Sequence, residues 1–353
     1  MIGNPGKVTS LIIASDGYLL WKKNLEALTG LNGTGLVLNV NVTVSRSTPT
    51  VAGELLIFGI YGPAVVIAVK RLTGELAWKR KLDDHAASIV TTSGTYYNGK
   101  PLFSSPKNRR LPEKENNQTI PSHPDSCVEP DNHLESILAF DLESSEIKRY
   151  HQLGGYDVWF FACSNVSTPN CPPGPNPDAY FGEAPMILSI YVKGRKKDIV
   201  AAVQKSGFAW ALDRDNGSLV WSTKAGPGGY IGGGIWEVAT DEKRVYTNIA
   251  NSENKNFTLT PSGKTVTAGG WVAMDARDAK ILWLVVDPRN STGSGPVTVA
   301  NGVPFGGSTY KRGPIYAINT KNGEILWSYD TSYCFWRDFT FSAGTSLFAV
   351  CVR

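Results

Sequence analysis

The sequence contains no apolar run long enough to cross a membrane, since such a span needs about 20 consecutive apolar residues. Charged residues make up only 19% of the chain, the net charge is +4, and the basic residues are scattered. This pattern gives little support for nucleic-acid binding. The phosphate-binding loop Gly-x-x-x-x-Gly-Lys-Ser/Thr, a Gly-x-Gly-x-x-Gly between strand and helix, and the Gly-x-Ser-x-Gly elbow are all absent. We therefore expect neither a nucleotide-binding protein nor a serine hydrolase.

Cysteine and histidine are few and dispersed. No Cys-x-x-Cys motif or His/Cys cluster predicts zinc among the five cysteines and four histidines. Cys163 and Cys171 flank a loop rich in proline and asparagine, and we expect them to form a disulfide. Closing a loop of this size stabilises a protein by about 2–3 kcal/mol. The odd number of cysteines leaves at least one thiol unpaired or intermolecular.

The N-terminus lacks the apolar core of a signal peptide, yet potential N-glycosylation sites are frequent. We therefore expect an extracellular or secretory-pathway glycoprotein whose natural N-terminal part is missing from this chain. The Asn-x-Ser/Thr sequons are at Asn41, Asn117, Asn165, Asn216, Asn256 and Asn290.

The stretch Asp198–Trp236 contains the clearest local structure. Turns at 205–207 and 215–217 bound short apolar segments, and the second turn contains Asn216-Gly217. Asn-Gly is the strongest short hairpin signal, because both central turn positions need positive φ. The pattern predicts a three-stranded antiparallel meander with strands Ile199–Val203, Phe208–Leu212 and Ser218–Thr223. The glycine-dense segment Gly226–Gly234 that follows either lets backbone approach a ligand or lets a strand corner fold.

Part of this meander recurs along the chain. Alanine, a turn glycine and tryptophan follow one another at spacings of six and four, as in Ala211, Gly217 and Trp221. Ala279 replaces the glycine in one copy; in another, Ser145 and Arg149 replace the glycine and the tryptophan. The slots for the tryptophan are at Trp21, Trp78, Arg149, Trp221, Trp283 and Trp327.

Recurrence of one hairpin unit at intervals of 44 to 72 residues predicts an all-β chain built as a β-propeller, with one four-stranded blade per unit and loops inserted in the longer units. The alternative is a hairpin-rich β-sandwich with scattered tryptophans. We expect one domain over residues 1–353, interrupted by an irregular insert at about 98–131 that has little periodicity. The alternation in Leu36–Val44 also predicts a strand.

The repeated unit resembles the tryptophan-docking motif of quinoprotein alcohol dehydrogenases, which use pyrroloquinoline quinone (PQQ). Longer strings resemble more narrowly the plant polyvinyl-alcohol-dehydrogenase-like proteins, over roughly Ile13–Thr331. These strings are Tyr61–Val66, Asn170–Pro175, Gly182–Pro185 and Gln204–Trp221. The resemblance implies a quinoprotein-type propeller, eight-bladed in the family and here incomplete with about six recognisable blades.

In this family PQQ lies at the propeller axis beside Ca²⁺, and an aspartate takes the alcohol proton while hydride passes to the quinone. By resemblance Lys205 is a cofactor-binding cation for the quinone oxygens, and Trp236 flanks the cofactor. The alternatives are an ordinary turn lysine and a core tryptophan. The family aspartate aligns with Tyr180, whose phenol is a poor base at neutral pH. Asp178 and Glu183 are the candidate catalytic carboxylates; otherwise they are loop or surface groups.

The adjacent Cys-Cys pair of the family is absent. The resemblance places that pair, a stacking tryptophan and the first calcium ligands near residue 100, so no metal ligand can be assigned. We expect an extracellular quinoprotein-type oxidoreductase with PQQ and Ca²⁺ as cofactors, acting on a small or polymeric alcohol, with no nucleic-acid partner. The alternative is a non-catalytic propeller: a binding or scaffold protein, or an inactive truncated family member.

Overall fold

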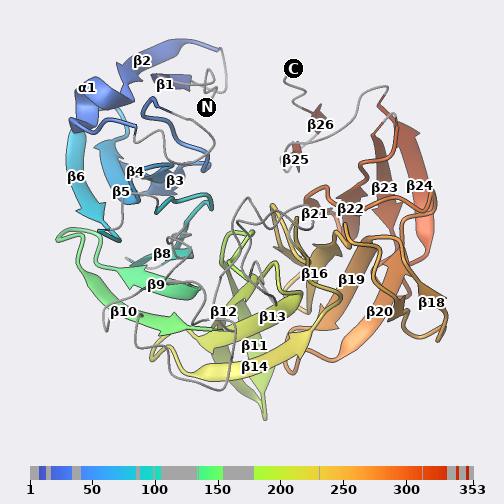
Figure 1. Cartoon of the computed structure of the whole chain (residues 1–353). Helices are drawn as coiled ribbons and strands as arrows, with labels where there is room; N and C mark the ends of the chain where they lie inside the picture. Colours follow the sequence, from blue (N-terminus) through green and yellow to red (C-terminus); the bar gives the residue numbers. More distant parts are fainter. Residues whose placement is uncertain are drawn as a thin grey trace, which may run out of the picture. The chain divides into compact units, whose positions relative to one another are not determined.

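The computed structural model describes residues 8–12, 17–33, 41–84, 88–97, 100–104, 133, 135–153, 179–229, 231–311, 313–331, 339–341 and 347–349. Strands dominate these residues, and every sheet is antiparallel (Figure 1). The chain divides into two compact units, Met1–Asn176 and Pro177–Arg353. The expectation of a single domain stays a prediction.

The first unit contains a two-stranded sheet, β1-β2, and two four-stranded sheets, β3-β4-β5-β6 and β10-β9-β8-β7. Its short helix α1 (Leu25–Thr29) begins at Asn24, whose side chain accepts the Ala27 N–H, and ends at Gly30 with φ 68°. The strands are β1 (Val8–Ile12), β2 (Leu19–Asn24), β3 (Thr50–Ala52), β4 (Leu55–Ile60), β5 (Val65–Lys70), β6 (Leu76–Lys81), β7 (Thr95–Tyr97), β8 (Lys100–Ser104), β9 (Ser136–Phe140) and β10 (Ile147–Gln152).

The second unit contains three four-stranded sheets, β11-β12-β13-β14, β15-β16-β19-β20 and β21-β22-β23-β24, with the small pairs β17-β18 and β25-β26. The meander expected over residues 199–223 is confirmed as β12, β13 and β14. The strands are β11 (Met186–Val192), β12 (Arg195–Val203), β13 (Phe208–Asp213), β14 (Leu219–Lys224), β15 (Ala239–Thr240), β16 (Arg244–Ile249), β17 (Phe257–Thr258), β18 (Thr265–Val266), β19 (Gly270–Asp275), β20 (Ile281–Val286), β21 (Val297–Ala300), β22 (Val303–Gly307), β23 (Pro314–Ile318), β24 (Ile325–Asp330), β25 (Phe339–Phe341) and β26 (Leu347–Ala349).

In each unit there are successive sheets that meet along their first strands. Strand β3 contacts β7 in the first unit, and β21 contacts both β15 and β25 in the second. The fourth strands are at the opposite edges of their sheets. Neighbouring sheets that share an inner edge and stack face to face are the blades of a β-propeller, so the expected fold class is confirmed.

The recurring tryptophan joins one blade to the next. In the four-stranded sheets that contain it, the tryptophan pairs across the third and fourth strands with the motif alanine, as Ala211 pairs with Trp221; Trp21, in the two-stranded sheet, pairs with Leu11. Its indole N–H then donates to a backbone carbonyl in the third-to-fourth-strand turn of the following sheet. These bonds run from Trp21 to Arg71 (2.8 Å), Trp78 to Leu142 (2.9 Å), Trp221 to Ala276 (2.9 Å) and Trp283 to Thr320 (2.9 Å).

The glycine of the motif has a second role besides the turn. Gly323 has φ 76°, and a Cβ there would lie 3.0 Å from the Trp283 ring and 2.6 Å from Val285. Gly74 receives Trp21 in the same way, with a Cβ only 2.6 Å from the indole. Left-handed backbone therefore coincides with the closest approach of the preceding blade's tryptophan.

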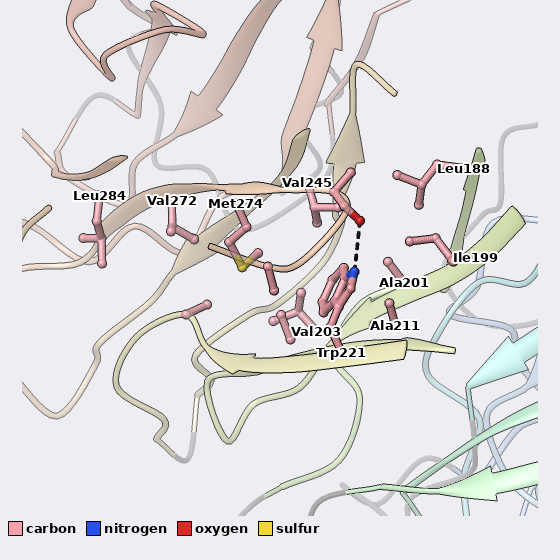
Figure 2. Packing of buried hydrophobic residues seen from close by; sticks show 14 of the residues in the cluster. Leu188, Ile199, Ala201, Val203, Ala211, Trp221, Val245, Val272, Met274 and Leu284 are labelled. Atoms are coloured by element: carbon pink, nitrogen blue, oxygen red, sulfur yellow. Dashed lines mark hydrogen bonds between the residues drawn. The ribbon is translucent and has the colours of Figure 1, made fainter. Parts of the chain in front are cut away.

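Packing between the first two sheets of the second unit shows how these contacts build a core. Trp221 is 7% exposed and lies between apolar side chains of both sheets, among them Val203 and Met274 (Figure 2). The dashed line in Figure 2 marks its hydrogen bond to the carbonyl of Ala276. An indole buries a large apolar area and satisfies its single donor at the same time.

Two expectations about irregular segments need correction. Residues 41–44 are not a strand: Thr43 donates its hydroxyl to the Leu31 carbonyl, and the Val44 carbonyl accepts the Tyr61 N–H. The expected insert at 98–131 begins with a strand, because β8 pairs with both β7 and β9. The rest of that insert, from 105 onward, lies outside the described residues, as do Cys163 and Cys171.

In the part of the chain that the structure describes, no helix is long and apolar enough to cross a membrane.

Candidate functional site

Three of the four candidate residues come together at one crossing of the chain in the second unit. Glu183 and Trp236 form a parallel β-bridge, and the Trp236 N–H donates to the Gly182 carbonyl at 2.8 Å. Lys205, in the turn between β12 and β13, accepts the Gly233 N–H at 2.8 Å on its own carbonyl. The fourth candidate, Asp178, lies outside the described residues.

Glu183 is fully buried, with 0% exposure. The pKa of its carboxyl is raised to about 8: burial raises it most, the nearby negative charge of Glu237 adds to the rise, and hydrogen bonds from the Thr247 hydroxyl and the Ile235 backbone oppose it. The Thr247 bond, from Oγ1 to Glu183 Oε1, is 2.6 Å long. At neutral pH this carboxyl is therefore mostly protonated, and it can accept a proton once it ionises.

Lys205 is also buried, at 6% exposure. Its Nζ lies 4.3 Å from the centre of the Tyr180 ring, which is a cation–π contact. Its backbone N–H donates to the Tyr180 carbonyl at 3.1 Å. The Tyr180 ring therefore covers one side of the ammonium group.

Trp236 is half-buried and has left-handed backbone, with φ 78°. A bulky residue rarely takes this conformation, and such residues cluster at binding and catalytic sites. The β-bridge to Glu183 holds the strained residue in place. Its intermediate exposure agrees with either interpretation of Trp236, cofactor-flanking or core.

The glycine-dense segment packs on the chain itself. A Cβ on Gly233 would lie 2.5 Å from the Gly207 Cα, and a Cβ on Gly234 would lie 2.4 Å from Val203 and 2.9 Å from Glu183 Oε1. These glycines therefore bring the Trp236 turn against the turn of Lys205.

Two site residues were missed from sequence, Thr247 and Asn248 of β16. Both are 0% exposed; Thr247 reaches Glu183, and Asn248 accepts the Ile235 N–H at 3.0 Å. The available signal was a pair of polar residues inside the otherwise apolar strand Val245–Ile249, because buried polar groups in strands normally have a bonding partner.

A metal site does not appear in the part of the chain that is described. No three acidic, histidine or cysteine side chains gather there. Calcium needs six to eight oxygen ligands, usually including several carboxylates. The donor set of these residues therefore does not fit Ca²⁺, and the expected metal ligands stay unassigned.

Comparison with known proteins places these features in a family. A family model, PQQ_2, described as "Outer membrane protein assembly factor BamB", matches residues 143–333, which is just over half of the chain. A polyvinylalcohol dehydrogenase from a Pseudomonas species is 29% identical over 209 residues, covering 56% of this chain and 30% of that protein. A second polyvinylalcohol dehydrogenase, from a Sphingopyxis species, is 23% identical over 353 residues, covering 92% of this chain and 51% of that protein. The chain thus spans a third to a half of these relatives.

Solved structures give the same fold. The quinohemoprotein alcohol dehydrogenase from Comamonas testosteroni superposes with a TM-score of 0.64 at 16% identity, over 93% of this chain and 57% of that one. A europium-containing methanol dehydrogenase superposes with a TM-score of 0.51 at 13% identity, over 92% of this chain and 74% of that one. The matched repeat and the docked tryptophans agree, and the chain belongs to the PQQ_2 repeat family, with the β-propeller fold of these solved structures.

Proposed function

We propose that this chain is a PQQ-type oxidoreductase that binds the quinone beside Lys205 and oxidises a small or polymeric alcohol. The observation that carries the proposal is that a buried lysine, Lys205, and a buried carboxyl, Glu183, both belong to one chain crossing in the second unit. Ionisable groups whose environment perturbs them cluster at functional sites. The names of the relatives and the fold point to the same chemistry.

Lys205 has the chemistry to hold an anionic quinone. An ammonium removed from water binds a negative oxygen more strongly than an exposed lysine does, because the local dielectric constant is low. The half-buried Trp236 offers a flat face for a planar ring system on the same crossing. These two side chains fit PQQ, which is planar and carries carboxylates; when bound, it supplies the site with a two-electron acceptor.

Glu183 is the base of the proposed site, in place of the tyrosine at position 180. A carboxyl whose pKa is about 8 is mostly ionised only above that pH, and its ionised form takes up a proton readily. Asp178 is the second candidate base. We derive no step through calcium, because the described residues do not fit that metal.

Cofactor binding is the first test. The chain is titrated with PQQ at micromolar concentration, with and without Ca²⁺, and binding is followed by quinone absorbance and tryptophan quenching. Loss of one charge-assisted hydrogen bond in Lys205→Ala should weaken binding roughly 10-fold or more. The matched control is Lys224→Ala, an exposed lysine on β14. Absence of uptake by the wild-type chain would contradict the proposal.

The pH dependence separates the roles of Glu183. Dye-linked alcohol oxidation should rise with pH until it passes about 8, and Glu183→Gln should abolish that rise.

The free energy of unfolding should change in the opposite sense. Because the pKa of Glu183 is raised from 4.5 to about 8 in the folded chain, its stabilising contribution is fully present below pH 4.5 and is lost as the pH rises through 8. Thermal melts of Glu183→Gln should show a weaker pH dependence over that range.

We also propose that the protein acts outside the cell and carries N-linked glycans. Four sequon asparagines belong to the described part, and all four side chains are exposed: Asn41, Asn216, Asn256 and Asn290. Secretion from a eukaryotic host, followed by glycan release and mass spectrometry, tests this proposal. Asn256→Gln should remove one glycan, and an unmodified chain would count against an extracellular location.

A non-catalytic propeller is the second candidate function. It is favoured by the Tyr180 ring over the Lys205 ammonium and by the lack of a metal-binding cluster in the described ranges. Binding of PQQ with no turnover of any primary or secondary alcohol would select this candidate.

A further inference from the structure

Strand β16 places two consecutive buried polar residues beneath the candidate site. Thr247 and Asn248 are both 0% exposed, and side chains of neighbouring strand residues point to opposite faces of the sheet. Thr247 accordingly reaches Glu183, and Asn248 reaches the Gly293 carbonyl, which lies in the segment before β21. The strand is thus bonded on both faces at the level of the site.

Thr247 contacts Glu183 directly. Its hydroxyl donates to Glu183 Oε1 at 2.6 Å, the length of a strong hydrogen bond to a carboxyl oxygen. Gly234 leaves room for this oxygen, because a Cβ there would lie only 2.9 Å from it. The glycine therefore admits the carboxyl oxygen, and the hydroxyl fixes where it lies.

Asn248 holds the turn that carries Trp236. Its Oδ1 accepts the Ile235 N–H at 3.0 Å, and its Nδ2 donates to Gly293 at 2.6 Å. Ile235 directly precedes Trp236, whose φ of 78° needs support from its surroundings. An amide that both accepts and donates ties this turn to the neighbouring segment in one orientation.

We propose that Thr247 and Asn248 are positioning residues of the candidate site: Thr247 sets the place and proton affinity of the Glu183 carboxyl, and Asn248 fixes the Trp236 turn. This inference rests on the proposed function for its purpose, but its tests need no quinone. Among the described residues, the charged group that acts on the Glu183 carboxyl is Glu237, which opposes its ionisation.

Titration of Glu183 in the quinone-free protein tests the role of Thr247. Difference infrared spectra against Glu183→Gln identify the carboxyl band of Glu183, and its intensity is followed with pH. Thr247→Val keeps the shape and removes the donor, so the carboxylate loses a bond and the apparent pKa should rise by about one unit. Thr247→Ser keeps the hydroxyl and should restore the wild-type titration.

The control is Thr240→Val on neighbouring β15, whose hydroxyl donates to the Arg244 carbonyl instead; it should leave the Glu183 titration unchanged. An unchanged titration in Thr247→Val would overturn the role of Thr247. If that variant does not fold, the wild type decides: the Glu183 acid band must lie at the lower frequency of a hydrogen-bonded acid. A band at the frequency of a free acid would overturn the role.

Fluorine NMR tests Asn248. With 5-fluorotryptophan incorporated, the Trp236 resonance is identified by its loss in Trp236→Phe. Asn248→Leu removes both bonds and should shift or broaden this resonance, whereas Asn248→Asp keeps the acceptor for Ile235 and should change it less. A Trp236 resonance that is the same in Asn248→Leu and wild type would overturn the role of Asn248. PQQ binding is then measured separately, so its failure is distinguishable from failure of this inference.

Discussion

Two edge strands of the second unit carry the same motif in different surroundings. On β20, Trp283 pairs with Ala273, is 1% exposed and donates to the Thr320 carbonyl. On β24, Trp327 pairs with Ala317 in the same register, yet it is 48% exposed and stacks on Tyr329, with ring centres 5.9 Å apart.

The difference lies in what faces each strand. The turn after β23 supplies the carbonyl and the glycine, Thr320 and Gly323, that receive Trp283. In the described part of the chain the Trp327 indole donates no corresponding hydrogen bond. Spacing and register therefore put both tryptophans in position, but only a neighbouring turn buries one of them.

The largest expected effect on stability is the difference between removing the Trp283 indole and removing the Trp327 indole. Trp283→Ala should lower the free energy of unfolding by about 3–5 kcal/mol, because it empties a packed site and removes a bond. Trp327→Ala should change it by about 0.5 kcal/mol or less, as at other exposed positions. Urea titrations of both variants give the comparison. Equal losses would mean that Trp327 is also buried in solution.

A smaller effect is expected at the glycines of the same sheet. Gly323 and Gly302 have nearly the same left-handed backbone, φ 76° and 74°, but only Gly323 has atoms close to where a Cβ would be. Gly302→Ala should cost about 1 kcal/mol from backbone strain. Gly323→Ala should cost about 1–3 kcal/mol more, because the methyl group displaces Trp283 and Val285. If the two variants melt alike, docking is loose enough to admit a methyl group.

The smallest effect is a gain in the turn that receives Trp221. Ala279 occupies the glycine slot with φ 60°, a conformation that costs an alanine about 1 kcal/mol. Ala279→Gly should therefore raise the free energy of unfolding by about 0.5–1 kcal/mol, measured by thermal melting. Ala276→Gly in the same turn has no positive φ to relieve and should be neutral or destabilising. A loss in Ala279→Gly would show that its methyl group packs usefully on the indole.

Sequence reasoning succeeded where the signal is local. The Asn216-Gly217 turn and the flanking apolar residues predicted the β12–β14 meander to within a few residues at each end, because positive φ and side-chain alternation act over short distances. Leu36–Val44 shows the limit. Its described residues 41–44 are irregular, since Thr43 and Val44 bond to Leu31 and Tyr61 outside any ladder.

The candidate site was found only in part. Glu183, Lys205 and Trp236 lie at one crossing, and Asp178 falls outside the described residues. Thr247 was missed because its partner Glu183 is 64 residues away in sequence. Nothing in β16 itself specifies which carboxyl its hydroxyl will meet.

The order of residues alone determined the hairpins, the repeated alanine–glycine–tryptophan unit and hence the propeller class, because turns and strand alternation depend on nearest neighbours in the chain. Tertiary structure decided which indole is buried, as with Trp283 and not Trp327, and the protonation of Glu183. Burial and proton affinity depend on the atoms that surround a group, and those atoms come from distant parts of the chain.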